Sequence, residues 1–465
     1  MIHLFNHYVP WRLLILIGLE AMVLLVAVQV GVSLQIAGLQ STISIDEVAA
    51  PTEAAAFTLG MMVFMASMGL YQSDQWNNTQ CIRARLVAPF ALALAMVALI
   101  AWIVPSLYPE VVLLGATTMT LALGGSLFVR AAFHRWNQLG AFKSRVLVLG
   151  TGSRVLKLAE YAQRNPNHHL IGYVSREPSK SYVPAKLLVP MAPQDTLLSI
   201  VEKHAIDEVV VAVRDRRGGG FPVQQLLECK ARGIRILELP TFFEREYRQV
   251  MLESLNPSWM VLGSGFHQSV LANLAKRLFD VIVSALLLVA YLPVLLVVAL
   301  LIVLESGFPV FYRQQRVGQD GRLFTLYKLR SMRNDAERGG DVQWAADNDD
   351  RTTRVGRFIR RYRIDELPQI FNVFKGEMSF VGPRPERPEF VDQLSRQIPF
   401  FALRHSVKPG ITGWAQVRYA YGASVDDAIE KLQHDLYYVK NHSLFLDIMI
   451  LIATVEVVLW GKGAR

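Results

Sequence analysis

The sequence is poor in cysteine and in charge. Its two thiols, Cys81 and Cys229, have no metal-ligand spacing and form no disulfide framework, so we interpret them as incidental thiols. Charged residues make up 19% of the chain and hydrophobic residues 52%, which excludes a wholly soluble protein. A net charge of +9 on such an apolar chain is typical of a membrane protein whose basic surfaces face anionic lipids or anionic substrates.

Long apolar runs are abundant near the start of the chain. Each is close to the length of about 20 residues that crosses a bilayer. The four runs are Leu13 to Leu34, Ala54 to Leu70, Leu86 to Ile103 and Val111 to Val129. The pattern predicts that residues 1–134 form a domain of four N-terminal transmembrane helices.

Two of the loops between these runs, 46–53 and 105–110, contain no lysine or arginine. The basic flanks lie on the other side of the predicted bundle. They are Arg12, Arg83, Arg85, Arg130, Arg135, Lys143 and Arg145. Because lysine and arginine near a span favour the cytoplasm, the chain is predicted to start inside and to return to the cytoplasm at about residue 134.

The stretch 144–250 alternates short apolar runs with polar segments, which predicts a cytoplasmic Rossmann-like α/β module. Buried parallel strands are predicted at 145–149, 208–213 and 234–239. The turn Gly150-Thr151-Gly152 is a weak dinucleotide signal, because Val155 stands where a third glycine would let the helix pack closely. We favour a regulatory or self-association module, consistent with a homodimer, over a nucleotide site.

A further apolar run, 278–304, has cations on both sides, which contradicts a simple crossing. The flanking cations are Lys276, Arg277, Arg313, Arg316 and Arg322. Pro293 lies near the middle, where it removes a helix hydrogen bond and favours a kink. Each half is too short to span, so we predict a re-entrant membrane hairpin with both ends in the cytoplasm. The alternative is an ordinary fifth crossing, which would export the residues that follow.

Two adjacent carboxylates, Asp365 and Glu366, follow an arginine-rich segment with apolar residues interleaved at helical spacing. The arginines are Arg351, Arg354, Arg357, Arg360, Arg361 and Arg363. Pro368 suits the first turn of a following helix, whose apolar residues are predicted to face the core. These residues are Ile370, Phe371, Val373 and Phe374. The helix dipole and the arginines would keep both acids ionised.

An ionised carboxylate beside guanidinium groups can bind a divalent cation, or attack a phosphorus centre whose charge the arginines offset. The alternative is a helix cap with surface salt bridges. The surrounding motifs favour the first interpretation. They are Pro309 to Gly318, Tyr327 to Met332, Met378 to Glu386 and Arg404 to Gln416.

This ordered set resembles the polyprenyl-phosphate hexose-1-phosphate transferases of bacterial polysaccharide assembly, the monotopic class of phosphoglycosyl transferases. The resemblance covers about residues 270–465, which predicts an α-rich catalytic domain with the re-entrant helix 278–304. The N-terminal spans and the α/β module resemble the larger members, which prime exopolysaccharide synthesis. Pro383 to Phe390 and the ending Gly461 to Arg465 resemble the exopolysaccharide branch.

The resemblance implies transfer of a hexose 1-phosphate from a nucleotide diphosphate sugar to undecaprenyl phosphate, at the cytoplasmic face of the bacterial inner membrane. By similarity, Asp365 is the nucleophile that forms a phosphosugar-enzyme intermediate. Glu366 is its partner, which assists with the metal or with deprotonation of the acceptor. A Mg²⁺ ion contacted by Asp365 would neutralise the diphosphate. UDP-glucose or UDP-galactose is the expected donor, with glucose ahead.

Further positions match the family in sequence. Those expected to hold phosphates are Lys328, Arg330, Arg360 and Arg384, with structural or lipid-facing cations as the alternative. Those that open the membrane hairpin are Lys276, Arg277 and Asp280. The basic pair there could meet the lipid phosphate or anchor at head groups, and we favour anchoring. Leu292 departs from the family, because many relatives carry serine before the re-entrant proline.

The remaining features are two histidines, the last apolar segment and the alternative functions of the chain. His405 and His434 are predicted to be hydrogen-bonded structural histidines rather than general bases. The apolar segment 443–460 contains Asp447 and Glu456, which predicts an interfacial amphipathic helix. Besides the transferase, a non-catalytic membrane scaffold or sensor with a ligand-binding α/β module stays open. Nucleic-acid binding is set aside, because no stacking aromatics or recognition helix accompany the basic residues.

Overall fold

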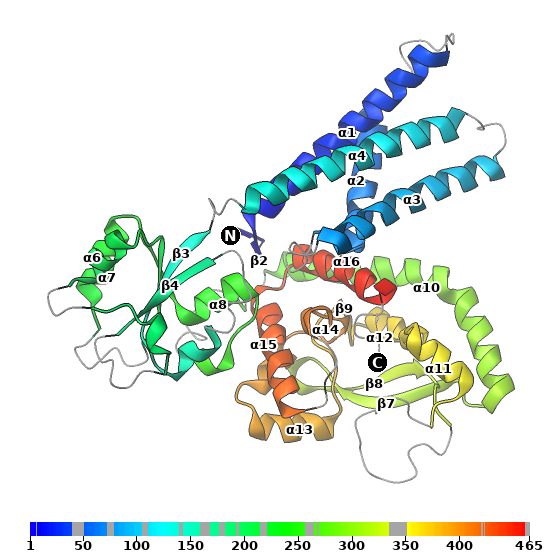
Figure 1. The fold of residues 1–465 in the computed structure, drawn as a ribbon. Helices are drawn as coiled ribbons and strands as arrows, with labels where there is room; N and C mark the ends of the chain where they lie inside the picture. The colour runs from blue at the N-terminus through cyan, green and yellow to red at the C-terminus, as the bar shows by residue number, and fades with distance from the viewer. Residues whose placement is uncertain are drawn as a thin grey trace. The chain divides into compact units, whose positions relative to one another are not determined.

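A computed structural model divides the chain into two compact units (Figure 1). Unit 1 combines residues 1–132 with residues 264–465, and unit 2 comprises residues 133–263. The structure describes residues 1–5, 7–39, 51–71, 79–104, 110–138, 143–158, 168–175, 182–191, 195–213, 221–255, 265–266, 269–333, 351–419, 422 and 424–460.

Unit 1 begins with a short antiparallel hairpin followed by helices. The hairpin strands are β1 (Ile2–Leu4) and β2 (His7–Val9), and the helices are α1 (Trp11–Leu39), α2 (Pro51–Ser67), α3 (Thr79–Ile103) and α4 (Glu110–Gln138). Leu24, Met65, Phe90 and Ala122, one from each helix, belong to a single buried cluster. The apolar runs predicted near the start of the chain all form helices that share this core.

Among the residues that the structure describes, four helical stretches are long and apolar enough to cross a membrane, so the protein is a membrane protein. They are Trp11–Leu34, Arg85–Ile103, Val112–Trp136 and Val270–Ser306. The second predicted span forms α2, whose 17 residues fall short of the length of about 20 needed to cross. Three of the four predicted N-terminal spans therefore meet the length and composition of a crossing helix.

Buried charges tie the N-terminal helices together and to the last helix of the chain, α16 (Leu444–Trp460). Arg130 donates to both oxygens of the buried Glu20 carboxylate, at 2.6 and 3.1 Å. Arg85 donates to Glu456 of α16 at 3.1 Å. Glu456 and Asp447, the two acids on which the amphipathic interpretation rested, are both buried within the protein. Each acid is paired with a cation of another helix, so the polar side of α16 faces protein groups.

The rest of unit 1 surrounds two small sheets, β7 with β8 antiparallel and β9 with β10 parallel. Its elements are α10 (Val270–Ser306), β7 (Phe311–Val317), η8 (Gln319–Gly321), β8 (Leu323–Leu329), α11 (Arg354–Arg361), η9 (Ile364–Glu366), α12 (Gln369–Lys375), β9 (Ser379–Val381), α13 (Pro388–Gln397), η10 (Phe401–Ser406), β10 (Gly410–Thr412), α14 (Trp414–Arg418), α15 (Val425–Asn441) and α16.

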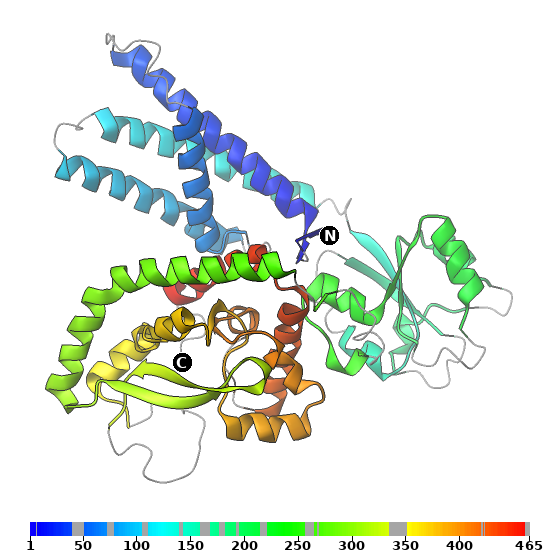
Figure 2. The same ribbon diagram turned by 180° about the vertical axis from the view of Figure 1, so that it is seen from behind.

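Helix α10 is a single helix whose ribbon bends part-way along its length (Figure 2). The Ser269 hydroxyl accepts a hydrogen bond from the Ala272 amide at 3.2 Å and caps the helix, which therefore starts before the predicted 278–304 segment. Pro293 lies inside the helix, where its ring removes one backbone hydrogen bond. The predicted break is thus a bend in a continuous helix.

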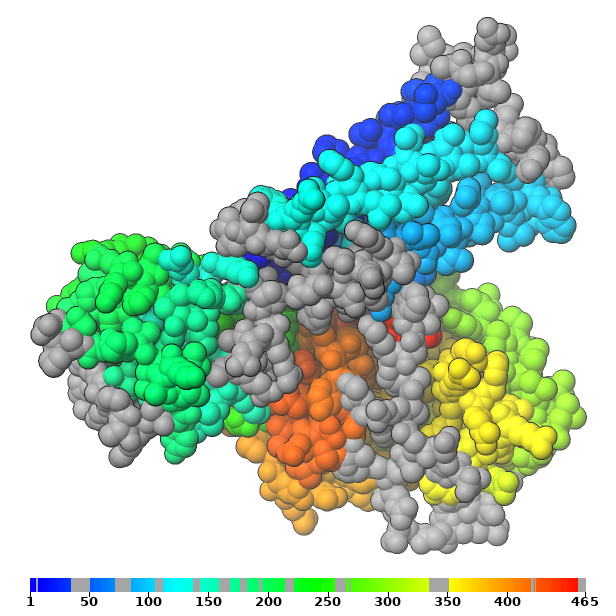
Figure 3. All heavy atoms as spheres, viewed as in Figure 1, coloured from blue at the N-terminus to red at the C-terminus, as the bar shows by residue number. Residues whose placement is uncertain are grey.

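The short helices α11 and α12 lie beside α10, as their surfaces do in Figure 3. Ile370 and Val373 of α12 are buried as predicted. Phe371 and Phe374 are exposed, which corrects the prediction that all four apolar residues face the core. A seven-residue helix has an outer face as well as an inner one, and Phe371 and Phe374 lie on the outer face.

Unit 2 is built on a four-stranded parallel sheet of order β4-β3-β5-β6. Its elements are β3 (Ser144–Leu149), η4 (Ser153–Val155), β4 (His168–Val174), η6 (Ala185–Leu187), α6 (Leu197–Lys203), β5 (Glu208–Val211), α7 (Val223–Ala231), β6 (Arg235–Glu238), α8 (Leu239–Tyr247) and η7 (Leu252–Ser254). The three strands predicted from sequence are confirmed as β3, β5 and β6. Alternate residues of β3 enter separate cores, Val148 with Phe243 of α8 and Leu147 with Leu226 of α7.

A buried ion pair joins α8 to the sheet of unit 2. Arg245 donates to both carboxylate oxygens of Glu208 on β5, at 2.5 and 2.8 Å, and Glu208 is fully buried. Arg245 also donates to Glu246 at 2.6 Å. Removing one partner of a buried pair leaves the other charge without compensation, which is more damaging than losing an exposed pair.

We therefore predict that Arg245→Met lowers the local stability of unit 2 by about 3 kcal/mol or more. Hydrogen exchange of the β5 amides in the full-length protein measures this loss. The control is Arg232→Met, which removes the exposed pair with Glu202 and should change the same exchange by less than about 1 kcal/mol. Equal effects of the two variants would contradict the structural role of the buried pair.

Candidate active site

The acid pair lies in η9, a single turn between α11 and α12. Arg363, just before it, has a left-handed backbone with φ 55°, which redirects the chain after α11. Asp365 and Glu366 are only 8% and 9% exposed. The pair is therefore close to α12 as predicted, but one turn before that helix and largely shielded from water.

Two cations from different parts of the chain converge on Glu366. Lys328 of β8 donates to Glu366 Oε1 at 3.1 Å, and Arg384 Nη2 donates to the same oxygen at 2.8 Å. Burial alone would raise the pKa of Glu366, but Arg384, Lys328 and Arg363 outweigh it and hold the pKa well below its usual range. Glu366 is thus an ionised anchor for two side chains that were predicted to bind phosphate.

The neighbouring carboxylate, Asp365, lies in a different electrostatic environment. Within the described part of the chain, Asp365 accepts no hydrogen bond and forms no ion pair. Burial raises the pKa of Asp365 to about 6, against the opposing charge of Lys328 and with the help of the Glu366 charge. The two adjacent acids are therefore unequal, since one is held by cations and the other is left available for a reaction or a metal.

The backbone that presents Arg384 is held from two sides. Arg404 Nη2 donates to the Arg384 carbonyl at 3.0 Å, and Arg316 donates to the Pro385 carbonyl at 3.1 Å. Arg404 is itself paired with the buried Asp435 of α15 at 2.8 Å. Sequence reasoning missed these positioning arginines. Both lie inside the motifs that carry the resemblance, but nothing in a motif says that a cation bonds to a carbonyl distant in sequence.

The other predicted phosphate-binding residues divide into two groups. Arg360 lies near enough for its charge to lower the pKa of Asp365, and it donates to Thr352 at 3.2 Å. Arg330 is buried and donates to Ser306 Oγ at 2.7 Å and to the Gly307 carbonyl at 2.6 Å, at the end of α10. The structure therefore brings Lys328, Arg360 and Arg384 to the acid pair and places Arg330 at the end of α10.

The residues predicted to open the membrane hairpin contact protein groups. Lys276 donates to Asp447 of α16 at 2.5 Å, and Arg277 donates to the carbonyls of Val373 and Phe374 at 2.6 and 2.7 Å. Asp280 Oδ1 accepts from Ser379 Oγ at 3.1 Å and from the Phe380 amide at 3.2 Å. These contacts join the start of α10 to α12, β9 and α16. Pro293 lies further along the same helix.

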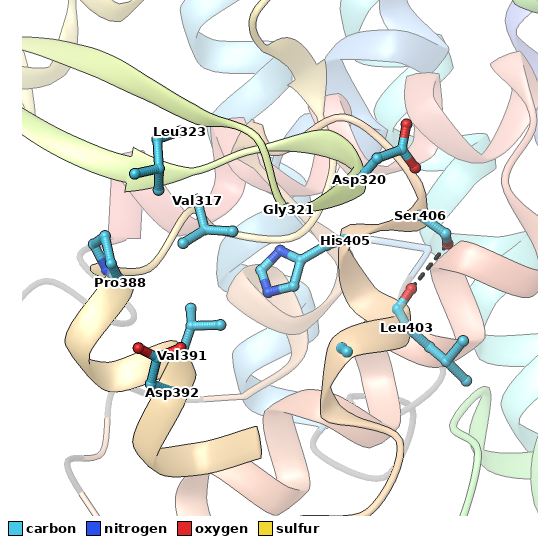
Figure 4. A pocket seen from close by; sticks show the side chains of 11 residues that line it. Val317, Asp320, Gly321, Leu323, Pro388, Val391, Asp392, Leu403, His405 and Ser406 are labelled. Carbon is cyan, nitrogen blue, oxygen red and sulfur yellow. Dashed lines mark hydrogen bonds between the residues drawn. The ribbon is translucent and has the colours of Figure 1, made fainter. Parts of the chain in front are cut away.

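A cavity of about 650 Å³ lies at the turn of the β7–β8 hairpin, between α13 and η10 (Figure 4). His405 points into it, and its Nε2 has no hydrogen-bond partner among the described residues. Burial and the charge of Arg404 lower the pKa of His405 to about 4, so it is a weak base. Asp320 and Asp392 line the cavity, and no lysine or arginine does, which disfavours a phosphate there.

The described residues contain no group of three or more His, Cys, Asp or Glu side chains suited to a closed metal site. Mg²⁺ commonly binds through one or two carboxylates together with substrate phosphates and water. An available Asp365 carboxylate beside Lys328 and Arg384 fits that open arrangement. A metal here would be shared between the protein and a phosphorylated substrate.

Comparisons with known proteins agree with this site. The profile of the family described as bacterial sugar transferase matches residues 271–461. A UDP-N-acetylgalactosamine-undecaprenyl-phosphate N-acetylgalactosaminephosphotransferase of Aeromonas hydrophila is 44% identical over 259 residues, 56% of this chain and 60% of that protein. A UDP-glucose:undecaprenyl-phosphate glucose-1-phosphate transferase of Xanthomonas campestris is 34% identical over 72% of this chain and 71% of that protein.

A protein of Klebsiella pneumoniae with the same name as the Xanthomonas relative is 33% identical over 70% of each chain. This chain belongs to the bacterial sugar transferase family, a family of enzymes. Its alignment with the Aeromonas relative spans less than two thirds of that protein. The particular reaction and substrates are therefore derived from the site below.

Proposed function

We propose that this enzyme transfers a hexose 1-phosphate from a UDP-sugar to undecaprenyl phosphate, as the priming step of exopolysaccharide synthesis. The observation that supports this most directly is the unequal acid pair. Glu366 holds Lys328 and Arg384 in place, while Asp365, beside them, has no hydrogen bond in the described part of the chain. A phosphoryl transfer needs this combination of fixed positive charge and an available nucleophile.

In the first step, an Asp365 carboxylate oxygen attacks the phosphorus attached to the sugar. The bond between that phosphorus and the oxygen bridging to UMP breaks, so UMP leaves and the sugar phosphate becomes an acyl phosphate on Asp365. Lys328, Arg360 and Arg384 offset the negative charge of the diphosphate. Arg330 is assigned instead to the end of α10, where it bonds to Ser306 and Gly307.

In the second step, a phosphate oxygen of undecaprenyl phosphate attacks the same phosphorus and displaces the Asp365 carboxylate. The products are a lipid diphosphate sugar and the free enzyme. Lys328 and Arg384 then share their charge between Glu366 and the diphosphate, which weakens their lowering of the Glu366 pKa and makes Glu366 a better proton acceptor for the incoming phosphate. A Mg²⁺ ion would be held by Asp365 and would further neutralise the diphosphate charge.

The proposed topology places the transferase residues 270–465 at the cytoplasmic face of the inner membrane, with α10 as a re-entrant helix. Its support is the bend in α10 together with Pro293 inside it (Figure 2). The acid pair and the cations that reach it all come from residues 328–384, after this helix. Undecaprenyl phosphate is embedded in the membrane, so a catalytic site beside a membrane helix can meet it.

The identity of the reaction is tested by release of UMP from purified protein supplied with undecaprenyl phosphate, Mg²⁺ and one UDP-sugar at a time. UDP-glucose and UDP-galactose are the proposed donors, with glucose ahead, and UDP-N-acetylgalactosamine is included because of the Aeromonas relative. Asp365→Asn should lower turnover about 1,000-fold or more, because an amide cannot act as the nucleophile.

The matched control is Asp392→Asn, an exposed carboxylate of α13 that lies in the His405 cavity and should leave turnover unchanged. Unaltered turnover in folded Asp365→Asn would remove Asp365 from the mechanism. Failure of every UDP-sugar to release UMP would contradict the proposed donor class.

The pH dependence tests the state of Asp365. The raised pKa of about 6 means that the protonated carboxyl persists up to that pH, and only the ionised form can attack phosphorus. We expect kcat/KM for the donor to be level above about pH 6 and to fall about tenfold per pH unit below it.

Lys328→Met should move this acid limb to higher pH, because the Lys328 charge lowers the pKa of Asp365. Lys375→Met is the control, since Lys375 bonds to the Tyr327 hydroxyl at 3.3 Å rather than to the acid pair. An acid limb that shifts equally in both variants, or in neither, would contradict the assignment to Asp365.

The re-entrant topology is tested by labelling single cysteines with a membrane-impermeant maleimide, in a chain with Cys81→Ser and Cys229→Ala. Ser269→Cys and Arg322→Cys, before and after α10, should both be protected in intact spheroplasts and labelled in inverted vesicles. Thr52→Cys, at the start of α2, should show the reverse. Labelling of Ser269→Cys and Arg322→Cys from opposite sides would establish an ordinary crossing instead.

A further inference from the structure

Two cations outside the acid-pair cluster converge at the far end of α12. Gly376 ends that helix with a left-handed φ of 88°. A Cβ at Gly376 would lie 3.3 Å from Arg277 Nη2 and 3.6 Å from Lys408 Nζ. Arg277 comes from α10, and Lys408 comes from the loop before β10, so a folded structure is needed to bring the two together. Two positive groups that approach the same point repel each other unless an anion lies near both.

Lys408 has no partner of its own in the described part of the chain. Its ammonium group forms no hydrogen bond or ion pair there, although the residue is partly buried. Burial, Arg277 and Lys276 lower the pKa of Lys408, and Asp280 opposes them. Asp280 is already bonded to Ser379 and Phe380, and Lys276 to Asp447. Lys408, Arg277 and Lys276 therefore face only Asp280 and Asp447 among these groups, which leaves the cluster with a net positive charge.

Capping of α12 explains the position of Arg277 but not that of Lys408. Arg277 donates to the carbonyls of Val373 and Phe374 and so satisfies the end of the helix. A guanidinium group has five N–H donors, and these two bonds leave three for another acceptor. Lys408 makes no bond to any of those carbonyls. An ammonium group held beside a capping arginine, with no acceptor, indicates a ligand with negative charge.

The surroundings of the pair are apolar and exposed. Leu274 and Leu278 are close to Arg277 in the sequence of α10, and Arg277 bonds to the carbonyl of Phe374 in α12. All three of these apolar side chains are well exposed. Helix α10 is also the most apolar of the helices long enough to cross a membrane. A phosphate next to exposed leucine and phenylalanine side chains is the arrangement of a lipid head group above its acyl chains.

We propose that Arg277 and Lys408 bind the phosphate of a membrane lipid, at a site separate from the acid pair. The seven residues of α12 lie between the two sites, which separates them by about 10 Å along the helix. A phosphate held here is therefore not the one under attack at Asp365, so the site goes beyond the proposed reaction. The lipid is either an anionic phospholipid of the bilayer or polyprenyl phosphate held before it reacts.

The test is native mass spectrometry of the detergent-solubilised full-length protein, titrated separately with phosphatidylglycerol, undecaprenyl phosphate, phosphatidylcholine and inorganic phosphate. Lys408→Gln should weaken binding of an anionic lipid about fivefold, as expected for one cation near a lipid surface. Lys408→Arg keeps the charge and should bind like the unaltered protein. The anionic lipid that binds more tightly identifies the source of the phosphate.

Lys203→Gln, an exposed lysine of α6 in unit 2, is the matched control for loss of one charge and should bind lipid normally. Equal affinity in Lys408→Gln, Lys203→Gln and the unaltered protein would overturn the proposal. Inorganic phosphate that binds as tightly as the lipids would overturn the assignment to a lipid. Neither readout requires turnover, so failure here is distinguishable from failure of the proposed reaction.

A second measurement needs no variant and so does not depend on how Lys408→Gln folds. A phospholipid with a photoactivatable head group should cross-link the unaltered protein within residues 270–280 or 403–412. Cross-links confined to other segments would also overturn the site.

Discussion

The contact on which the site depends is the attraction of Lys328 and Arg384 to the buried carboxylate of Glu366. Lys328 belongs to a strand and Arg384 to a proline-rich loop, and the local structure of these two elements does not by itself bring the side chains together. A charge shielded from water attracts cations more strongly than an exposed one. Glu366 therefore brings together the two cations proposed to bind phosphate, and Asp365 beside it has no hydrogen bond or ion pair among the residues described.

Cations elsewhere in unit 1 neutralise buried carboxylates in the same way, and there they stabilise the packing of helices. Two buried acids on the N-terminal and C-terminal apolar helices have a basic partner on another helix, Glu20 with Arg130 and Glu456 with Arg85. An uncompensated buried carboxylate is strongly destabilising, so these pairs fix which helices can be neighbours. Some cations have no acidic partner of this kind, and Lys408 is the clearest case among the residues described.

The position of the acid pair also suits a reaction between a water-soluble donor and a membrane-embedded acceptor. Helix α10 is apolar and mostly exposed, and α11 and α12 lie against it with aromatic side chains on their outer faces. The acid pair sits between α11 and α12, so the elements that lie against this apolar helix also position the proposed nucleophile. One short segment thus links membrane association to phosphate chemistry.

The sequence by itself determined the apolar helices, the parallel strands around residues 145, 208 and 234, and the importance of Asp365 and Glu366. These follow from local periodicity, run length and the order of motifs, all of which are properties of neighbouring residues. Only the tertiary structure decided that Glu366 rather than Asp365 takes the cations, that Arg330 bonds to the end of α10, and that Asp447 is buried against Lys276. Each of these is a contact between charges far apart in the chain, and its strength depends on burial, which a linear pattern does not contain.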